Sequence, residues 1–138
     1  MINKDRAINK FMELVQIDSV SLNEKGVADY LTRHFSELGY EVVEDKKSNE
    51  AVPKSNSGNI IVRIPGVGSM ANNDIIILEA HMDTVEPGNG VKPSISADGK
   101  YVVSDGTTIL GADDKAGIAQ IIEVEAVLRE QELDHPPL

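Results

Sequence analysis

The feature that most constrains the fold is the sequence DIIILEA at residues 74–80, a short apolar run without alternation. A strand with one solvated face alternates apolar and polar residues, whereas a strand buried on both faces is apolar throughout. We therefore expect a central strand here, covered on both sides. A chain of 138 residues that is 41% hydrophobic is long and apolar enough for one domain with such a core.

Apolar residues at helical spacing predict three helices, at residues 4–16, from about 21 to 38, and at 114–131. At the start of the second helix, Ser21 and Glu24 match a capping box. The third helix is apolar around much of its circumference, so we expect it to pack against a sheet.

Shorter strands are expected at 40–45 and 59–66, and the polar stretch 46–59 predicts a loop. The turn sequence Asp98-Gly99 lies between two β-like pieces and indicates a hairpin. This order predicts an α/β fold in which helices pack on a mixed β-sheet. An α/β unit normally returns to another strand after such a helix, so the end ELDHPPL indicates a piece of a longer chain.

The formal net charge of −10, with no basic run, makes nucleic acid and anionic membranes poor partners. The absence of cysteine excludes disulfides and thiolate zinc sites, so any metal site must use His, Asp and Glu. The N-terminus is polar and amphipathic, and no apolar run approaches the roughly 18 residues of a membrane span. A cytoplasmic location is therefore expected.

His81 and Asp83 directly follow the apolar run. At positions i and i+2 of an extended chain, their side chains project to the same side, at the strand end where open α/β sheets bind ligands. A neutral imidazole suits a metal ion, and Asp83 could hold the ring N–H or bind the metal itself. The alternative is a histidine paired with a local carboxylate in an ordinary turn.

Asp113 and Asp114 precede the third helix, and either carboxylate could simply cap it. However, Gly111 and Gly117 bracket the pair and permit unusual backbone or close packing. Adjacent acids also repel each other unless a cation or hydrogen-bond donors compensate them. Asp113, just ahead of the helix, is better placed than Asp114 to point into a cleft.

The other polar candidates are weaker. We expect a structural role for His34, beside the apolar face of the second helix, and a solvated position for His135 in a proline-rich tail. No serine or threonine has the His-acid constellation of nucleophilic catalysis nearby, so a serine hydrolase is not expected. The turn PGVGS at 65–69 lacks the pattern of a phosphate-binding loop.

Three segments together carry a family resemblance: LVQIDSVSLNE, EAHMDTVEPGNG and SDGTTILGADDKAGIAQIIE, in this order and spacing. They resemble the N-terminal part of the co-catalytic dizinc exopeptidase and deacylase superfamily, over nearly the whole chain. The wording HMDTV and GADDKAG is most similar to the peptidase T-like (tripeptidase) branch of metallopeptidases.

The resemblance implies a role for each site residue. His81 would bind zinc, Asp83 would have a catalytic role in orienting and polarising that histidine, and Asp113 would bridge two zinc ions. Asp114 and Lys115 would lie just behind these residues, and the Asp113–Asp114 peptide bond is a candidate for the cis form. The implied chemistry is a water activated between two metals for attack on an amide carbonyl, with cobalt or manganese as alternative metals.

The family's glutamate pair, its remaining metal ligands and its lid and dimerisation domain have no counterpart in residues 1–138. The resemblance thus implies the N-terminal portion of a catalytic domain, whose parent removes N-terminal residues from short peptides, and an isolated chain that is inactive. Two alternatives are a deacylase or carboxypeptidase of the same superfamily, and a non-catalytic remnant or complementing module. A truncated sheet edge would promote self-association.

Overall fold

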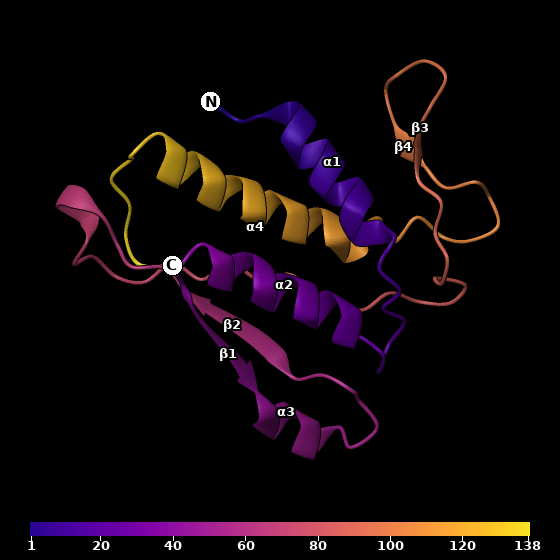
Figure 1. Ribbon diagram of the computed structural model, residues 1–138, viewed down its shortest axis with the longest axis horizontal. Coiled ribbons are helices and arrows are strands. Elements are labelled where there is room, and N and C mark those ends of the chain that lie inside the picture. Colours follow the sequence, from indigo (N-terminus) through magenta and orange to yellow (C-terminus); the bar gives the residue numbers. More distant parts are fainter.

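The computed structural model describes residues 1–138, apart from the side chain of Asn49. Figure 1 shows the long helices at the centre of the molecule, with one pair of strands below them and a smaller pair of strands projecting to one side. In chain order the elements are α1 (Lys4–Val15), α2 (Lys25–Glu37), β1 (Glu41–Asp45), α3 (Lys46–Ala51), β2 (Asn59–Arg63), the 3-10 helix η1 (Gly68–Met70), β3 (Ser94–Ile95), β4 (Val102–Val103) and α4 (Ala112–Glu130).

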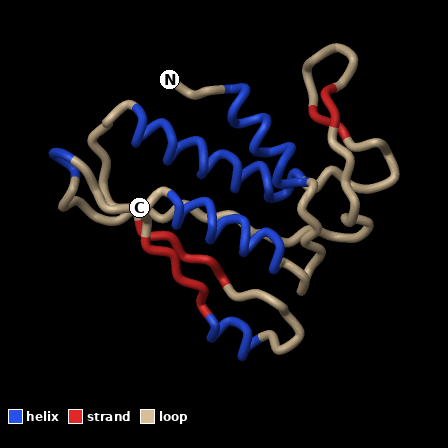
Figure 2. Tube along the Cα trace, viewed as in Figure 1, coloured by secondary structure: helices blue, strands red, loops and turns tan.

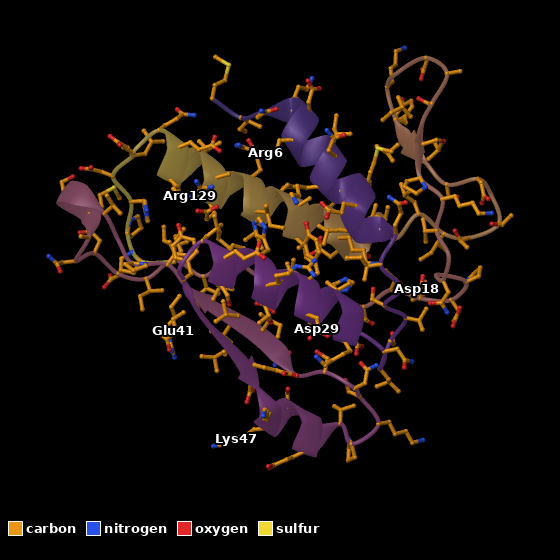
Figure 3. The ribbon with its side chains drawn as sticks, viewed as in Figure 1. Arg6, Asp18, Asp29, Glu41, Lys47 and Arg129 are labelled. Carbon is orange, nitrogen blue, oxygen red and sulfur yellow. The ribbon has the colours of Figure 1, made fainter. Side chains whose placement is uncertain are left out.

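The three predicted helices are present and enclose the core. Asn3 caps the start of α1, and its side chain accepts a hydrogen bond of 3.0 Å from the Arg6 amide. Helix α1 packs along α4. Arg6 lies on the side of α1 that faces α4 (Figure 3), where it pairs with Glu123. The core consists of Leu14, Val27, Tyr30, Leu31, Phe35, Ile118, Ala119 and Ile122.

The predicted strands β1 and β2 form an antiparallel pair, with Val42 opposite Val62. Ile60 and Val62 of β2 pack against the core, because alternate residues of a strand face the same side. The predicted hairpin is also confirmed, because β3 and β4 pair around a turn in which Gly99 has a left-handed φ of +72°.

The expected mixed sheet is not observed among the described residues. The strands form two separate antiparallel pairs, and the parallel pairing that is described is a single bridge between Val20 and Thr84. The predicted loop at 46–59 was wrong in its first part, because α3 forms there. The Asp45 side chain caps this helix by accepting a hydrogen bond of 3.0 Å from the Lys47 amide.

The prediction of a central strand at 74–80 was also wrong. This segment has no strand assignment, and Ile75 and Ile77 are 68% and 82% exposed. Its end nevertheless approaches the core, because Ala80 packs there. The segment does not form a strand because it lacks lateral partners. Within the described residues, the backbone hydrogen bond of its apolar run goes from the Ile76 amide to Pro137 O. Figure 2 shows that the chain between η1 and α4 is mostly loop.

Among the described residues, no helix combines the length and the apolar character needed to cross a membrane.

Candidate metal centre

His81 contacts two carboxylates that come from different parts of the chain. Its Nε2 lies 2.9 Å from Asp113 Oδ1, and its Nδ1 lies 3.1 Å from Asp83 Oδ1 and 3.0 Å from the Asp83 carbonyl oxygen. The His81 side chain is 52% exposed and that of Asp113 is 95% exposed. The structure therefore brings together the three side chains singled out in the sequence, at a position open to solvent.

This arrangement determines the electrostatics of the histidine. Burial acts to lower the pKa of His81, but hydrogen bonds to Asp113 and Asp83 outweigh it, and the pKa is raised above its ordinary value. A ring protonated at both nitrogens donates to both carboxylates. Once the Nε2 proton is lost, His81 Nε2 and Asp113 Oδ1 are the two atoms that would hold a metal cation.

Asp83 is itself held in place by Ser21, whose Oγ donates a hydrogen bond of 2.5 Å to Asp83 Oδ2. The adjoining backbone is fixed as well, since the Thr84 amide donates to Ser19 O and the Ser21 amide donates to Thr84 O. The capping box predicted for Ser21 was therefore wrong. Glu24 occupies the N-cap of α2 without a side-chain capping bond, and Ser21 contacts the site instead.

Asp113 and Asp114 have different orientations. Gly111, with a left-handed φ of +75°, leads into the pair, the Asp113–Asp114 peptide bond is cis as the resemblance implied, and both residues have non-helical dihedral angles. Asp114 Oδ1 accepts a hydrogen bond of 3.0 Å from the Gly117 amide, so Asp114 caps the helix. Asp113 is thereby left to face His81.

Lys115 points away from the carboxylates and into the protein. It is 1% exposed, and its Nζ donates a hydrogen bond of 2.6 Å to Ile17 O. Burial lowers the pKa of Lys115 to about 8, against the attraction of Asp18. Lys115 therefore ties the start of α4 to the segment that carries Ser19 and Ser21.

Two glutamates of α4 and the other two histidines have structural contacts. Glu123 pairs with Arg6, and Glu125 accepts hydrogen bonds from Tyr40 and Arg129. His34 is partly buried and stacks with a tyrosine, in keeping with the structural role expected of it. The prediction of a solvated His135 was wrong, because this residue is 7% exposed and forms a backbone bridge to Val67.

The site occupies a cleft of about 290 Å³ lined by His81, Asp83, Asp113 and residues 84–85 and 109–112. A larger groove of about 510 Å³ lies at the other end of α4, around Leu128, and contains none of the candidate ligands.

The donor atoms suit zinc in kind but not in number. An imidazole nitrogen and a carboxylate oxygen are typical zinc ligands, and the contact of Asp83 with the second ring nitrogen is the usual support for such a histidine. In the part of the chain that the structure describes, no group of three or more such side chains could hold a metal ion. His81 Nε2 and Asp113 Oδ1 are thus two atoms of the kind that zinc uses as donors, whereas a structural or catalytic zinc site has four ligand positions.

No protein-family model matches the chain. The uncharacterized protein YqjE of Bacillus subtilis is 44% identical over 135 residues, which cover 98% of this chain and 34% of that protein. Other matching proteins are named peptidase T in several bacteria and cytosol non-specific dipeptidase in Escherichia coli.

Solved structures of peptidases match the chain as well. Aminopeptidase PepT from Bacillus cereus superimposes with a TM-score of 0.89 at 48% identity, and a tripeptidase from Staphylococcus aureus with a TM-score of 0.89 at 43% identity. Each match covers 99% of this chain and 35% of the other. The chain therefore spans about a third of the length of the proteins it matches.

These matches identify the class: the chain is homologous to the N-terminal portion of the peptidase T, tripeptidase and dipeptidase family of metallopeptidases. The two proteins with these structures are a tripeptidase and the aminopeptidase PepT. The resemblance to this family is thereby confirmed.

Proposed function

We propose that residues 1–138 form the N-terminal portion of the catalytic domain of a dizinc aminopeptidase that acts on short peptides. The C-terminal half of that domain and a lid or dimerisation domain would come from outside these residues. The observation that carries the proposal is the convergence of His81 Nε2 and Asp113 Oδ1, 2.9 Å apart, in an open cleft.

Each residue then has a defined task. His81 would bind the metal through Nε2 while its Nδ1–H donates to Asp83, which fixes the orientation and tautomer of the ring. The charge of Asp83 would make the ring a stronger ligand, so its catalytic effect passes through His81.

Asp113 would supply a carboxylate able to bridge two ions. Asp114 and Lys115 would support this carboxylate by fixing the start of α4, through Gly117 and Ile17 respectively. When bound, zinc, or cobalt or manganese in its place, would activate water and polarise a peptide carbonyl.

The names of the matching proteins, tripeptidase, aminopeptidase and peptidase T, support short peptides as substrates. The relative named cytosol non-specific dipeptidase supports a cytoplasmic location. With two of the metal donors, residues 1–138 alone are expected to bind zinc weakly and to show no turnover of a tripeptide with zinc or cobalt. Turnover by this chain that His81→Ala abolishes would contradict the proposed incompleteness.

A chimera tests the function itself. Residues 1–138 replace the matching portion of the Bacillus cereus aminopeptidase, which is 48% identical. We expect tripeptide hydrolysis, and we expect His81→Ala and Asp113→Asn to lower kcat/KM by about 1000-fold or more, since each removes a group that holds the activating metal. His34→Gln is the matched control, because His34 lies away from the cleft. A folded chimera whose activity survives His81→Ala would refute the proposal.

A further inference from the structure

Hydrogen bonds join two segments that are far apart in the sequence, directly beside His81. The Ser19 hydroxyl donates a bond of 2.9 Å to Met82 O, and Ser19 O accepts one of 2.9 Å from the Thr84 amide. The Ser21 amide donates a bond of 3.0 Å to Thr84 O. Ser19 and Thr84 are 0% and 3% exposed, so water competes little with these bonds. The backbone of Ser21 is therefore fixed independently of its side chain.

The side chain of Ser21 reaches from this fixed backbone to Asp83. Its hydroxyl donates a hydrogen bond of 2.5 Å to Asp83 Oδ2. This length is typical of a hydroxyl that donates to a charged carboxylate, which is the stronger kind of hydrogen bond. The other oxygen of the same carboxylate, Oδ1, lies 3.1 Å from His81 Nδ1. Since both oxygens belong to one rigid planar group, a bond that fixes Oδ2 also fixes Oδ1 beside the imidazole ring.

Without such a bond the Asp83 carboxylate would be free to turn away. Its side chain is 38% exposed, so water can solvate the carboxylate in other orientations. His81 Nδ1 also lies 3.0 Å from the Asp83 carbonyl oxygen, and this backbone acceptor remains wherever the carboxylate turns. The Ser21 hydroxyl therefore decides whether the ring has a charged partner in addition to a neutral one. A charged partner makes an imidazole the more basic ligand.

We infer that Ser21 is a positioning residue of the candidate metal centre, whose hydroxyl holds the carboxylate of Asp83 against His81. The ring then presents Nε2 to the metal with a negative charge behind it. This inference rests on the proposed function, since it assigns Ser21 a role toward the metal that His81 would bind. The alternative is that the Ser21 hydroxyl serves the fold alone, as the buried hydroxyl of Ser19 does.

The first test follows the exchange of the His81 Nδ1 proton with water, by NMR of the chain at pH 5.5. The ring carries both protons at this pH, because the pKa of His81 is raised above its ordinary value of about 6.5. We expect Ser21→Ala to speed the exchange by about tenfold or more, since the proton loses its charged acceptor. Ser21→Thr keeps the hydroxyl at an exposed position and should restore the slow exchange.

Ser19→Ala is the matched control. It removes the same group from the same segment, but that hydroxyl bonds to the backbone of Met82 and not to the carboxylate. Because Ser19 is fully buried, we expect Ser19→Ala to lower the melting temperature and to leave the exchange at His81 unchanged. Ser21→Ala should show the reverse, a smaller change in melting temperature with faster exchange, because Ser21 is exposed.

The second test measures zinc affinity, by competition with a chelator, in the chimera with the Bacillus cereus aminopeptidase. We expect Ser21→Ala to weaken zinc binding by about tenfold, which is the lower end of the range for residues that support metal ligands. Ser21→Thr should bind zinc as the unsubstituted chimera does, and so should Ser19→Ala.

Unchanged exchange or unchanged zinc affinity in Ser21→Ala would overturn the inference. So would an effect that Ser21→Thr does not restore or that Ser19→Ala reproduces, because Ser21 would then act through the fold alone. A failure of the proposed function is recognised separately. In that case His81→Ala also leaves the zinc affinity of the chimera unchanged, and the inference falls with it, whereas a failure of the inference alone leaves the effect of His81→Ala intact.

Discussion

The contact between Arg6 and Glu123 joins α1 to α4 and gives a prediction whose size follows from the structure. Arg6 Nε and Nη2 donate hydrogen bonds of 2.6 and 3.0 Å to the two oxygens of Glu123, which is 4% exposed. The Asn3 amide also donates to Glu123 Oε1, at 2.6 Å. In Arg6→Ala, Glu123 Oε1 keeps the hydrogen bond from the Asn3 amide, and Glu123 Oε2 loses the hydrogen bond from Arg6 Nε.

Removing one partner of a buried ion pair costs about 3–5 kcal/mol. The Arg6 side chain is 25% exposed, so water can reach the carboxylate in the variant, and we expect a loss of about 2–3 kcal/mol in the free energy of unfolding at pH 7. The hydrogen bond from Arg6 holds the pKa of Glu123 below its ordinary value. The stabilisation of the folded protein by the Arg6–Glu123 contact is therefore present above the ordinary glutamate pKa of about 4.3. It is lost as pH falls through the lower pKa of Glu123 in the folded protein.

Urea unfolding at pH 7 and pH 3 measures both effects, and the difference between wild type and Arg6→Ala should shrink at pH 3. Arg63→Ala is the control, because the Arg63–Glu41 pair is exposed and should contribute no more than about 1 kcal/mol. An Arg6→Ala loss no larger than that of Arg63→Ala, or one that is unchanged at pH 3, would refute the reasoning.

Two further predictions concern single positions. Gly111→Ala should destabilise the protein by more than the roughly 1–2 kcal/mol of a left-handed alanine, because the added Cβ would also lie 3.2 Å from the Thr84 side chain. Gly90→Ala is the control, because Gly90 has a similar φ and its added Cβ would meet no atom within 4 Å. In thermal unfolding this control should show the backbone cost alone. Burial, with the hydrogen bond to Glu125, raises the pKa of Tyr40 to about 12. In an ultraviolet titration, Tyr40→Phe should therefore remove a phenol ionisation near pH 12. Ionisation of the Tyr40 phenol near pH 10 would contradict the buried contact.

The parts of the fold that the sequence predicts are those that depend on local pattern. The apolar spacing in residues 4–16 and 114–131 sets the buried face of α1 and α4 wherever the helices pack. The turn at Asp98-Gly99 likewise forms within a few residues of sequence. These elements need no distant partner for their conformation.

The failure at residues 74–80 occurs where a distant partner decides the conformation. The composition of residues 74–80 favours a buried strand, but a strand also needs lateral partners, and the described residues supply it with a single backbone bond from Ile76. In α3, the local cap at Asp45 outweighs the loop-like composition.

The site shows the same division. The order of motifs suggested that His81 and Asp113 belong together, and the structure places them in contact across 32 positions of sequence. The bond from Ser21 to Asp83 spans 62 positions and has no local signature, since the neighbouring residues resemble an ordinary helix cap. The parallel bridge between Val20 and Thr84 brings these segments side by side.

The central claim is that His81 is a metal ligand, and histidine-selective NMR tests it directly, because the chain has three histidines. On addition of zinc, the account predicts that the ring nitrogens of His81 shift in a manner typical of binding through Nε2, that Asp113→Asn weakens the effect, and that the rings of His34 and His135 stay unchanged. Zinc-induced shifts at His34 or His135 with none at His81, or no shift at any of the three rings, would contradict it.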